Sequence, residues 1–508
     1  MIYFYTNAVS EIVIQGSFST LVTEKMRLKP NRYFLIIIVV FGIIYSLISL
    51  VNHYNFRTYA LDLGAYTNAL YDYIHFQWND STAFKEVGEN LLADHFDLYL
   101  ILFSPLSLIF KTYTLLLVQI FFILLGGYGV YKFFMLSEKT SRLAVFAALY
   151  FCLFFGVFAA LSYDYHSNVV AAVMLPWFFY FVKKRELLPA ALMLLFIIVS
   201  KENISLWMAF VSLGLAFEYR KEPRIRNFLL MAFVFSIIYF VTVLSVVMPW
   251  FSNSNAYPHF HYSALGSSAS GALAHLFQHP VDSFKILFIN HNNTLHGDYV
   301  KLELHLLLLL SGLPLLILKP QYFLMLIPIY FQKLFHDNYI MWGISGQYNI
   351  EFAPVLATGI FLAISEFKNT RLMKTSAVVV VIAAFLCTFR TMDNTVFFTS
   401  KSKIRFYQII HYTRDYDVKK VHQQLSEIPK DAVVSAQSPF LPHLALRDNI
   451  YQFPVIKDAE YIVYSEKEKF YPLDQKTFRI EKLKLETSEE WLILYQDEGF
   501  TVLKRRNK

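Results

Sequence analysis

Residues 33–51 read YFLIIIVVFGIIYSLISLV, a run that contains no charged side chain. A helix that crosses the hydrocarbon core of a bilayer needs about 20 mostly apolar residues, because no water is present there to bond its backbone. The run therefore predicts a transmembrane helix and places the chain among membrane proteins.

The rest of the chain repeats this pattern. Of its 508 residues, 56% are hydrophobic and only 16% are charged, whereas soluble domains have about a quarter charged. The predicted fold is mainly α, a polytopic transmembrane helical bundle of about eleven spans. The predicted spans lie near residues 33–51, 113–135, 143–161, 168–183, 187–200, 204–218, 227–250, 302–318, 321–335, 350–366 and 373–390.

Basic residues occur in alternate loops. One set of loops contains the cluster 25–32, then 139–142, 183–185, 220–226, 319 and 368–374, and the other set is poor in lysine and arginine. By the positive-inside rule the basic set is cytoplasmic. We therefore expect a multi-pass protein of the bacterial plasma (inner) membrane with a cytoplasmic N-terminus. The net charge of +7 then reflects topology, and no nucleic-acid partner is expected.

Three regions differ in character. Residues 1–26 form an N-terminal extension, which could precede a true start at Met26. Residues 27–390 form the transmembrane domain, with large external loops at 52–112 and 251–301.

Residues 391–508 are charged throughout and predict a small, soluble, extracytoplasmic α/β domain. AVVSAQ (432–437) and EYIVYS (460–465) have strand patterns, DVKKVHQQLSEIP (417–429) predicts a helix, and 497–499 predict a hairpin turn. Cys152 and Cys387 fall in apolar segments, which excludes a disulfide framework.

Asp62 is the candidate catalytic residue. Tyr66, Ala69, Leu70 and Tyr73 follow it at helical spacing, which predicts an amphipathic helix along the membrane interface. Asp62 could be only the N-cap of that helix. Alternatively, partial burial raises its pKa and makes it a general base.

Further polar residues gather in the predicted external loops. Asp164 and His166 could both face one cleft or could merely solvate a turn, and Lys201 and Glu202 could form only a surface pair. The histidines could bind a divalent metal ion, whose identity stays unknown. The pattern His-x-His is weak evidence for metal. The candidates for a substrate cleft are Asp94, His95, Asp164, His166, Glu202, His259, His261 and Tyr348.

Several motifs together resemble a known family. LDLGAYTNALYDYIHFQW, LLADHFDLYLILFSPLSLIF, SYDYHSN, IIVSKENISLW, GQYNIEFAPVLA and SPFLPHLALRDNIYQFP are similar to bacterial and archaeal membrane proteins grouped as domain of unknown function 2079. The resemblance extends in order from about residue 27 to about residue 464.

That family is similar in turn to the integral-membrane glycosyltransferases of the GT-C class, which use a polyprenyl-phosphate sugar donor at the outer membrane surface. This resemblance implies that Asp62 is the catalytic acid or base and that Lys201 binds the donor phosphate. Gln347 stands where the class has a basic residue in a late motif. The implied acceptor is a glycan, a lipid or a protein.

Glycosyl transfer from a lipid-linked donor is therefore the leading hypothesis. No Walker A, dinucleotide-binding, zincin or nucleophile-elbow motif occurs in a fitting context. The alternatives are a lipid or solute transporter or flippase, and a non-catalytic assembly protein of the cell envelope. Transporters place ionisable residues near the bilayer midplane, where this sequence has almost none.

Overall fold

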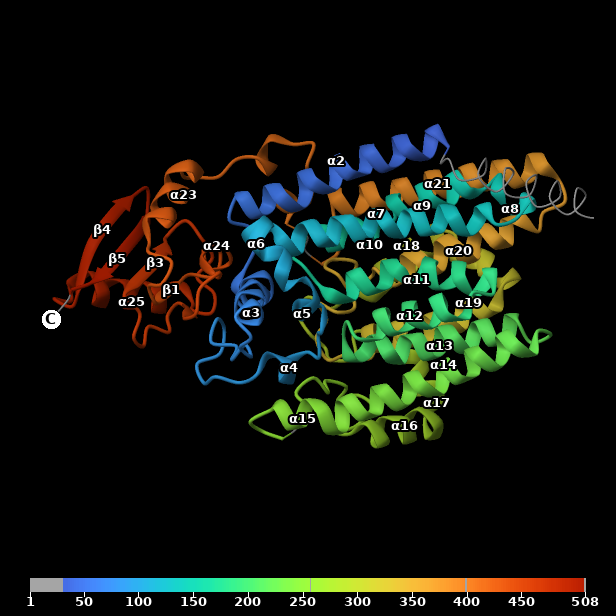
Figure 1. The fold of residues 1–508 in the computed structure, drawn as a ribbon, viewed down its shortest axis with the longest axis horizontal. Helices are drawn as coiled ribbons and strands as arrows, with labels where there is room; N and C mark the ends of the chain where they lie inside the picture. The colour runs from blue at the N-terminus through green and yellow to red at the C-terminus, as the bar shows by residue number, and fades with distance from the viewer. Residues whose placement is uncertain (1–30, 256, 398–399, 507–508) are drawn as a thin grey trace, which may run out of the picture.

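The computed structural model describes residues 31–506 apart from 256 and 398–399, so the extension 1–26 lies outside the described residues. The longer helices lie side by side in one bundle, and a small sheet domain lies beyond one end (Figure 1). The bundle helices are α2 (Arg32–Tyr54), α7 (Thr114–Met135), α9 (Ala144–Leu153), α10 (Phe155–Leu161), α11 (Ser167–Lys184), α12 (Leu187–Ile198), α13 (Glu202–Glu218), α14 (Pro223–Thr242), α18 (Val300–Leu310), α19 (Pro320–Leu334), α20 (Phe352–Ser365) and α21 (Thr370–Asp393).

The two long predicted loops are built largely from short helices. The first holds η1 (Ala60–Gly64), α3 (Ala65–Ile74), α4 (Leu91–Asp94), α5 (Tyr99–Phe103), η2 (Ser104–Leu106), α6 (Ser107–Phe110) and η3 (Lys111–Tyr113). The second follows η4 (Val243–Val247) and α15 (Met248–Phe251) and holds α16 (Ala269–Gln278) and α17 (Pro280–Ile286). Two further short elements, α8 (Glu138–Ser141) and η5 (Leu313–Leu318), connect bundle helices.

Helix length supports fewer spans than the sequence predicts. Among the described residues, four helical segments are long and apolar enough to cross a membrane: Arg32–Tyr54, Tyr99–Met135, Pro223–Phe251 and Thr370–Asp393. The pair α9 and α10, bent by 44° at its break, would make a fifth.

The prediction of about eleven spans is not supported by these lengths. Predicted spans 187–200 and 350–366 form helices of 12 and 14 residues. At 1.5 Å per residue, 14 residues extend about 21 Å, which is short of a hydrocarbon core of about 30 Å. Hydropathy identified the apolar segments, but these two form helices that are too short to cross the core without distortion of the bilayer.

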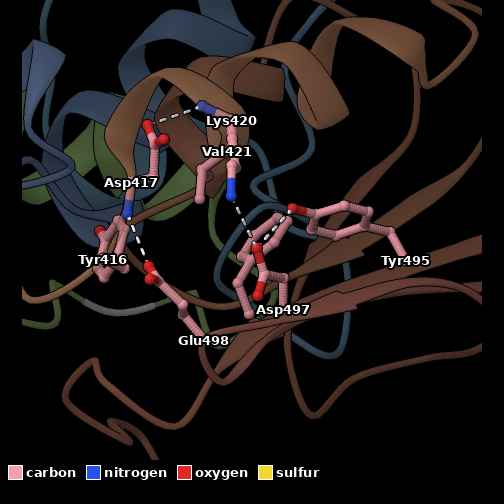
Figure 2. A pocket seen from close by; sticks show the side chains of 8 residues that line it. Tyr416, Asp417, Lys420, Val421, Tyr495, Asp497 and Glu498 are labelled. Atoms are coloured by element: carbon pink, nitrogen blue, oxygen red, sulfur yellow. Dashed lines mark hydrogen bonds and ion pairs between the residues drawn. The ribbon is translucent and has the colours of Figure 1, made fainter.

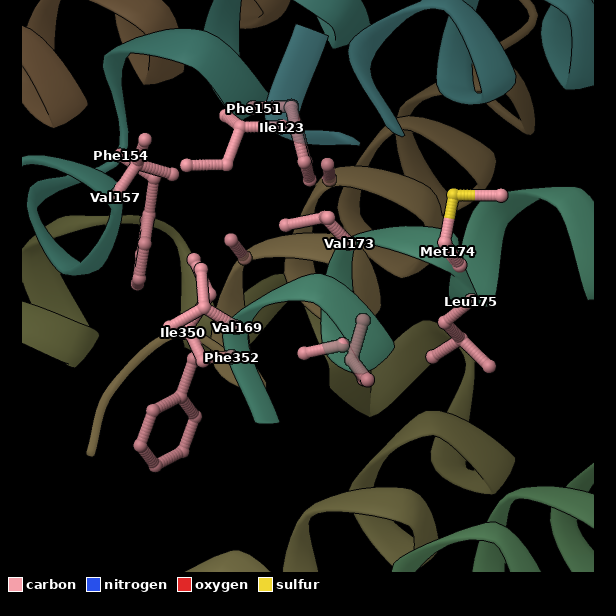
Figure 3. Packing of buried hydrophobic residues seen from close by; sticks show 14 of the residues in the cluster. Ile123, Phe151, Phe154, Val157, Val169, Val173, Met174, Leu175, Ile350 and Phe352 are labelled. Atoms are coloured by element: carbon pink, nitrogen blue, oxygen red, sulfur yellow. The ribbon is translucent and has the colours of Figure 1, made fainter. Parts of the chain in front are cut away.

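The bundle core is mostly apolar, with a few buried hydroxyl side chains such as that of Thr358. Figure 3 shows side chains from α7, α9, α11 and α20 meeting there, and Ile123, Phe151, Val173 and Phe352 are each fully buried. Lipid tails are as apolar as these side chains, so close packing rather than exclusion of water stabilises helix contacts of this kind in a membrane. The bundle is thus a packed body that leaves polar chemistry to its ends.

The C-terminal domain confirms the prediction of a small α/β unit. Its five-stranded sheet has the order β2-β1-β3-β5-β4, in which β1 is parallel to β2 and β3 while β5 is antiparallel to β3 and β4. Its elements are α22 (Lys401–Ile404), η6 (Ile409–His411), α23 (Val418–Glu427), β1 (Val434–Ala436), α24 (Leu441–Leu444), β2 (Ile450–Gln452), β3 (Tyr461–Ser465), α25 (Gln475–Thr487), β4 (Trp491–Asp497) and β5 (Phe500–Arg505).

The first external loop and the C-terminal domain share a core. Phe56, Ala60, Ala65 and Ala83 belong to the same buried cluster as the apolar side chains of β1, α23 and α24. Arg57 donates hydrogen bonds to the backbone oxygens of residues 410, 411 and 413. The domain is therefore fixed on the end of the bundle and covers the segment that carries Asp62.

Basic loops meet at the other end of the bundle, where α8 lies far from the sheet (Figure 1). Lys139 and Lys319 both pair with Glu366, at 2.9 and 3.1 Å. Arg185 pairs with Glu222 at 2.9 Å. Loops that alternate along the chain thus gather on one side, as the charge pattern predicts.

Candidate functional site

Asp62 lies in η1, a single π-helical turn that precedes α3. The C-terminal domain packs directly on this turn: the Ala60 amide donates to Ser438 Oγ at 3.1 Å. A Cβ atom on Gly64 would lie 2.5 Å from Leu441 Cδ2, so a larger residue here would require the buried Leu441 side chain to shift. The N-cap positions of η1 and α3 are Tyr59 and Gly64, so Asp62 is not a cap.

The surroundings of α3 differ from the prediction. An interfacial amphipathic helix should keep one face exposed, but residues 65–70, 72 and 73 are all buried. The helix packs against α5 and α24. The apolar side chains at helical spacing therefore serve an internal contact between the bundle and the C-terminal domain, and the prediction of an interfacial helix is wrong.

The Asp62 carboxylate is half-buried and interacts electrostatically with four charged groups. They are Asp164 and Asp94, which are acidic, and Lys201 and Lys403, which are basic. Burial, followed by the negative charge of Asp164, raises the pKa of Asp62 to about 7, and the two lysines oppose this rise. A carboxylate with such a pKa can accept and release a proton near neutrality.

Asp164 contacts both the backbone next to the Asp62 turn and the side chain of Lys403. Its Oδ2 accepts the Tyr59 amide at 2.8 Å and its Oδ1 lies 3.7 Å from Lys403 Nζ. Both side chains are nearly inaccessible, at 2% and 9% exposure. Burial raises the pKa of Asp164 and lowers that of Lys403. Asp164 is thus a buried partner of a lysine, which excludes the view that it merely solvates a turn.

The rest of the short 162–167 loop is equally enclosed. Gln119 from α7 donates to the Asp164 backbone oxygen at 3.0 Å and accepts the His166 amide at 3.0 Å. The His166 ring is 4% exposed, and burial lowers its pKa well below the ordinary value. His166 is therefore a neutral ring held close to the charged groups.

A second network connects the first loop to the start of α13. Lys201 Nζ donates to His95 Nε2 at 3.1 Å, and His95 Nδ1 donates to Glu202 Oε1 at 3.2 Å. Burial raises the pKa of Glu202, but its interactions with His95, which include their hydrogen bond, and with Lys201 outweigh this and lower the pKa to about 2. Glu202 is 2% exposed, which excludes a plain surface pair with Lys201.

Asp94 and His259 extend this network into the second external loop. His259 Nε2 donates to the Asp94 backbone oxygen at 2.8 Å and lies 3.4 Å from Asp94 Oδ1. The rings of His95 and His259 stack with centroids 4.5 Å apart. His261 instead faces His336, at 5.6 Å between ring centroids, and its ring lies 6.4 Å from that of His259.

Aromatic side chains border Asp62. Tyr163 and Tyr348 both interact electrostatically with its carboxylate. Tyr163 is 42% exposed, and its ring lies 5.2 Å from Lys403 Nζ. Exposed tyrosine rings of this kind can stack on a sugar or other flat apolar face.

The structure therefore gathers nearly all the predicted side chains. Around Asp62 and Lys201 it places Asp94, His95, Asp164, His166, Glu202, His259 and Tyr348, and it leaves out His261.

Sequence reasoning missed Lys403 and Asp97. Lys403 reaches Asp62 and Asp164 from α22, which lies beyond the last bundle helix. Asp97 is buried, and burial raises its pKa to about 7. The sequence marks Lys403 only as one basic residue of the charged segment after the last apolar helix, whereas the signal for Asp97 is an acid at the start of an apolar stretch.

A separate shallow pocket lies on the C-terminal domain (Figure 2). Its polar groups already bond one another: Lys420 pairs with Asp497 at 3.2 Å, and the Asp417 amide donates to Glu498 at 3.0 Å. Lys420 and Asp497 are both exposed. Neither Lys420 nor Asp497 has a pKa shifted toward neutrality as that of Asp62 is.

Fold and site thus define a class of protein: a helical membrane protein that has an α/β domain on one end of its bundle and a cluster of buried charges between the bundle and this domain. The chain belongs to the family described as predicted membrane protein (DUF2079), whose model matches residues 52–508. The match begins at the end of α2 and includes both the Asp62 segment and the C-terminal domain. Among curated proteins, none matches the chain.

Proposed function

We propose that this protein is a membrane glycosyltransferase of GT-C type that moves a sugar from a polyprenyl-phosphate donor to an acceptor. The observation that carries the proposal is a single half-buried carboxylate, Asp62, with a pKa of about 7 and with two lysine ammonium groups acting on it. A base next to cations suits a reaction that needs a proton acceptor and a charged leaving group.

In the proposed reaction, an acceptor hydroxyl or amine attacks the anomeric carbon of the donor sugar. The new bond to that carbon forms as its bond to the lipid phosphate oxygen breaks, and the phosphate leaves with the electron pair. Asp62 takes the acceptor proton. Lys201 binds the phosphate as a compact positive charge.

Lys403 supplies a second cation in this proposal. GT-C enzymes place a basic residue in the late motif where this chain has Gln347, which is buried. Lys403 lies over the ring of Tyr59 at 4.8 Å and beside Asp164. A lysine held in this way remains at the site without donor. It would take the role that Gln347 cannot fill.

The acceptor side is assigned to the groups around Asp94, His95 and His259, and the acceptor is a glycan, lipid or protein of the envelope. The C-terminal domain would select it, because α24 packs on the turn that carries Asp62. No resident organic cofactor is required by this reaction.

The proposed orientation follows from the two ends of the bundle. The basic end, with Lys139, Arg185 and Lys319, would face the cytoplasm of a bacterial plasma membrane, and the C-terminal domain would lie outside. The shorter bundle helices would complete about eleven crossings as tilted or broken spans. To test this orientation, single cysteines are placed at residues 139, 221 and 474 and labelled with a membrane-impermeant thiol reagent. Only the cysteine at position 474 should react in intact cells.

The decisive experiment uses full-length protein in vesicles with radiolabelled polyprenyl-phosphate sugar and extracted envelope acceptors. Wild type should transfer label, and Asp62→Asn should lose about 10²–10⁴-fold of the rate while inserting normally. Equal transfer by Asp62→Asn would overturn the role of Asp62. Movement of the donor between leaflets without transfer would favour a flippase, and neither activity would favour an assembly protein.

A further inference from the structure

The side chains of Asp94, His95 and His259 converge from two separate loops. Each offers one ligand atom, and these atoms all lie within 4.8 Å of one another. Asp94 Oδ1 is 3.4 Å from His259 Nε2, and Asp94 Oδ2 is 4.0 Å from His95 Nε2. Ligands of one metal ion bonded at about 2.0–2.2 Å in a tetrahedron lie roughly 3.3–3.6 Å apart, so small side-chain movements suffice.

Glu202 lies next to His95, where it can orient this histidine as a metal ligand. Glu202 accepts a hydrogen bond from His95 Nδ1 at 3.2 Å. This bond fixes the tautomer in which Nε2 carries the free lone pair and faces Asp94. A metal-bound histidine typically donates its other nitrogen to a carboxylate in this way, which orients the ring and increases its basicity.

We propose that Asp94, His95 and His259 form a three-ligand site for a divalent transition-metal ion, with Zn²⁺ as the best fit. Two imidazoles and one carboxylate suit zinc and leave a fourth coordination position open. The three side chains are 24%, 21% and 30% exposed, so an ion can reach them from water. The inference does not rest on the proposed glycosyl transfer.

Lys201 gives this site an internal competitor. Its ammonium donates to the same His95 Nε2, at 3.1 Å. An ammonium and a metal ion cannot both use one lone pair, so metal binding would release Lys201 from His95. His259 Nε2 carries the proton of its hydrogen bond to the Asp94 backbone oxygen. To bind the ion, the ring would pass to the tautomer that is protonated at Nδ1, which frees the Nε2 lone pair and breaks that hydrogen bond.

The test measures zinc in the purified full-length protein in detergent, stripped with a chelator and reloaded with Zn²⁺ alone. Wild type should hold about one ion per chain by elemental mass spectrometry. His95→Ala and His259→Ala should bind at least tenfold more weakly, and Glu202→Gln about 10–100-fold more weakly. His261→Ala is the matched control, since it removes a histidine of the same loop that lies outside the cluster and should bind as wild type does.

Lys201→Met should bind zinc at least as tightly as wild type, because it removes the competing ammonium. Folding of each variant is checked by its melting temperature without metal, and added Zn²⁺ should raise that temperature in wild type but not in His259→Ala. Zinc content in the double variant His95→Ala/His259→Ala equal to that of wild type would overturn the proposal, as would wild type that binds none.

Asp62→Asn separates this inference from the proposed function. That variant should lose transfer and retain zinc. Zinc binding without any transfer by wild type would sustain the metal site and defeat the glycosyltransferase, and transfer without zinc binding would do the reverse.

Discussion

The two ends of the bundle use charge in opposite ways. At the basic end, Lys139 and Glu366 form an ion pair with both partners at least half exposed, at 57% and 50%. At the sheet end, Lys403 and Asp164 are 9% and 2% exposed. Water screens the first pair, whereas the second lies in a poorly solvated site where each charge depends on its partner.

The two ends therefore differ in the role we assign to their charges: membrane orientation at the basic end and chemistry at the sheet end. Exposed ion pairs at the basic end are weak and replaceable, typically about 0–1 kcal/mol each. Charges at the sheet end are expensive to bury, and burial, followed by the negative charge of Asp164, raises the pKa of Asp62 to about 7. A buried group with a perturbed pKa and specific charged neighbours is a candidate for function, which is why the proposed site lies at that end.

The largest expected effect breaks the buried pair. Lys403→Met leaves the Asp164 carboxylate without its cation and should cost about 3–5 kcal/mol in the free energy of unfolding at pH 8. The measurement is unfolding in mixed micelles with increasing SDS. Because the folded pKa of Asp164 is raised, the folded state binds the proton more readily, and the loss should shrink as pH falls through that pKa.

The double variant Lys403→Met/Asp164→Asn is the control for this prediction. It removes the Asp164 charge together with its cation, so it should recover part of the lost stability. A loss below about 1 kcal/mol for Lys403→Met would place the pair in the same class as the exposed pairs of the basic end.

The next effect tests the contact that holds Asp62 beneath the C-terminal domain. Gly64→Ala places a Cβ atom 2.5 Å from Leu441 Cδ2, and Leu441 is fully buried. Overpacking of this kind should cost about 1–3 kcal/mol, measured as a lower melting temperature. Gly42→Ala is the matched control, because its Cβ would lie at an ordinary 3.5 Å from Leu124. A wild-type melting temperature for Gly64→Ala would mean that α24 yields freely.

The pH dependence of transfer sharpens the assignment of Asp62. Only the deprotonated carboxylate can accept a proton, and its pKa is about 7. Initial rates should therefore reach a plateau above pH 7 and fall about tenfold per unit below it. The residual rate of Asp62→Asn should lack this step. A wild-type profile that is flat from pH 5 to 9 would remove Asp62 from the reaction.

The smallest expected effect lies at the basic end. Glu366→Gln removes the partner of the exposed Lys139 and the half-buried Lys319 and should change the free energy of unfolding by less than about 0.5 kcal/mol. Transfer should be unchanged. A cost above about 1 kcal/mol in the same SDS assay would show that this end is held by charge after all, and the contrast between the two ends would fail.

Local pattern was sufficient for much of the fold. The apolar run 33–51 became part of α2, and the sequence 417–429 contains the helix α23. Strands β1 and β3 lie within the predicted segments, and β4 and β5 meet at the predicted turn. These elements depend on neighbours along the chain, so periodicity and turn residues are enough to find them.

The sequence predicted most of the ionisable residues of the candidate site, but not which residues contact one another there. The high cost of ionisable groups near a membrane singled out Asp62, Asp164 and Lys201. It did not identify Lys403, since hydropathy describes α22 only as part of a charged domain. The helical spacing after Asp62 was read correctly as a helix, but its surroundings depend on α24, which lies far along the chain.

The sequence by itself determined that the chain is a helical membrane protein with a charged C-terminal α/β domain, because apolar run length and residue alternation are local properties. Tertiary structure decided how long each helix is, that the C-terminal domain covers the Asp62 turn, and that His259 meets Asp94 and His95. These outcomes depend on contacts between distant segments, and the energy of a charge depends on what buries it and which opposite charge lies beside it.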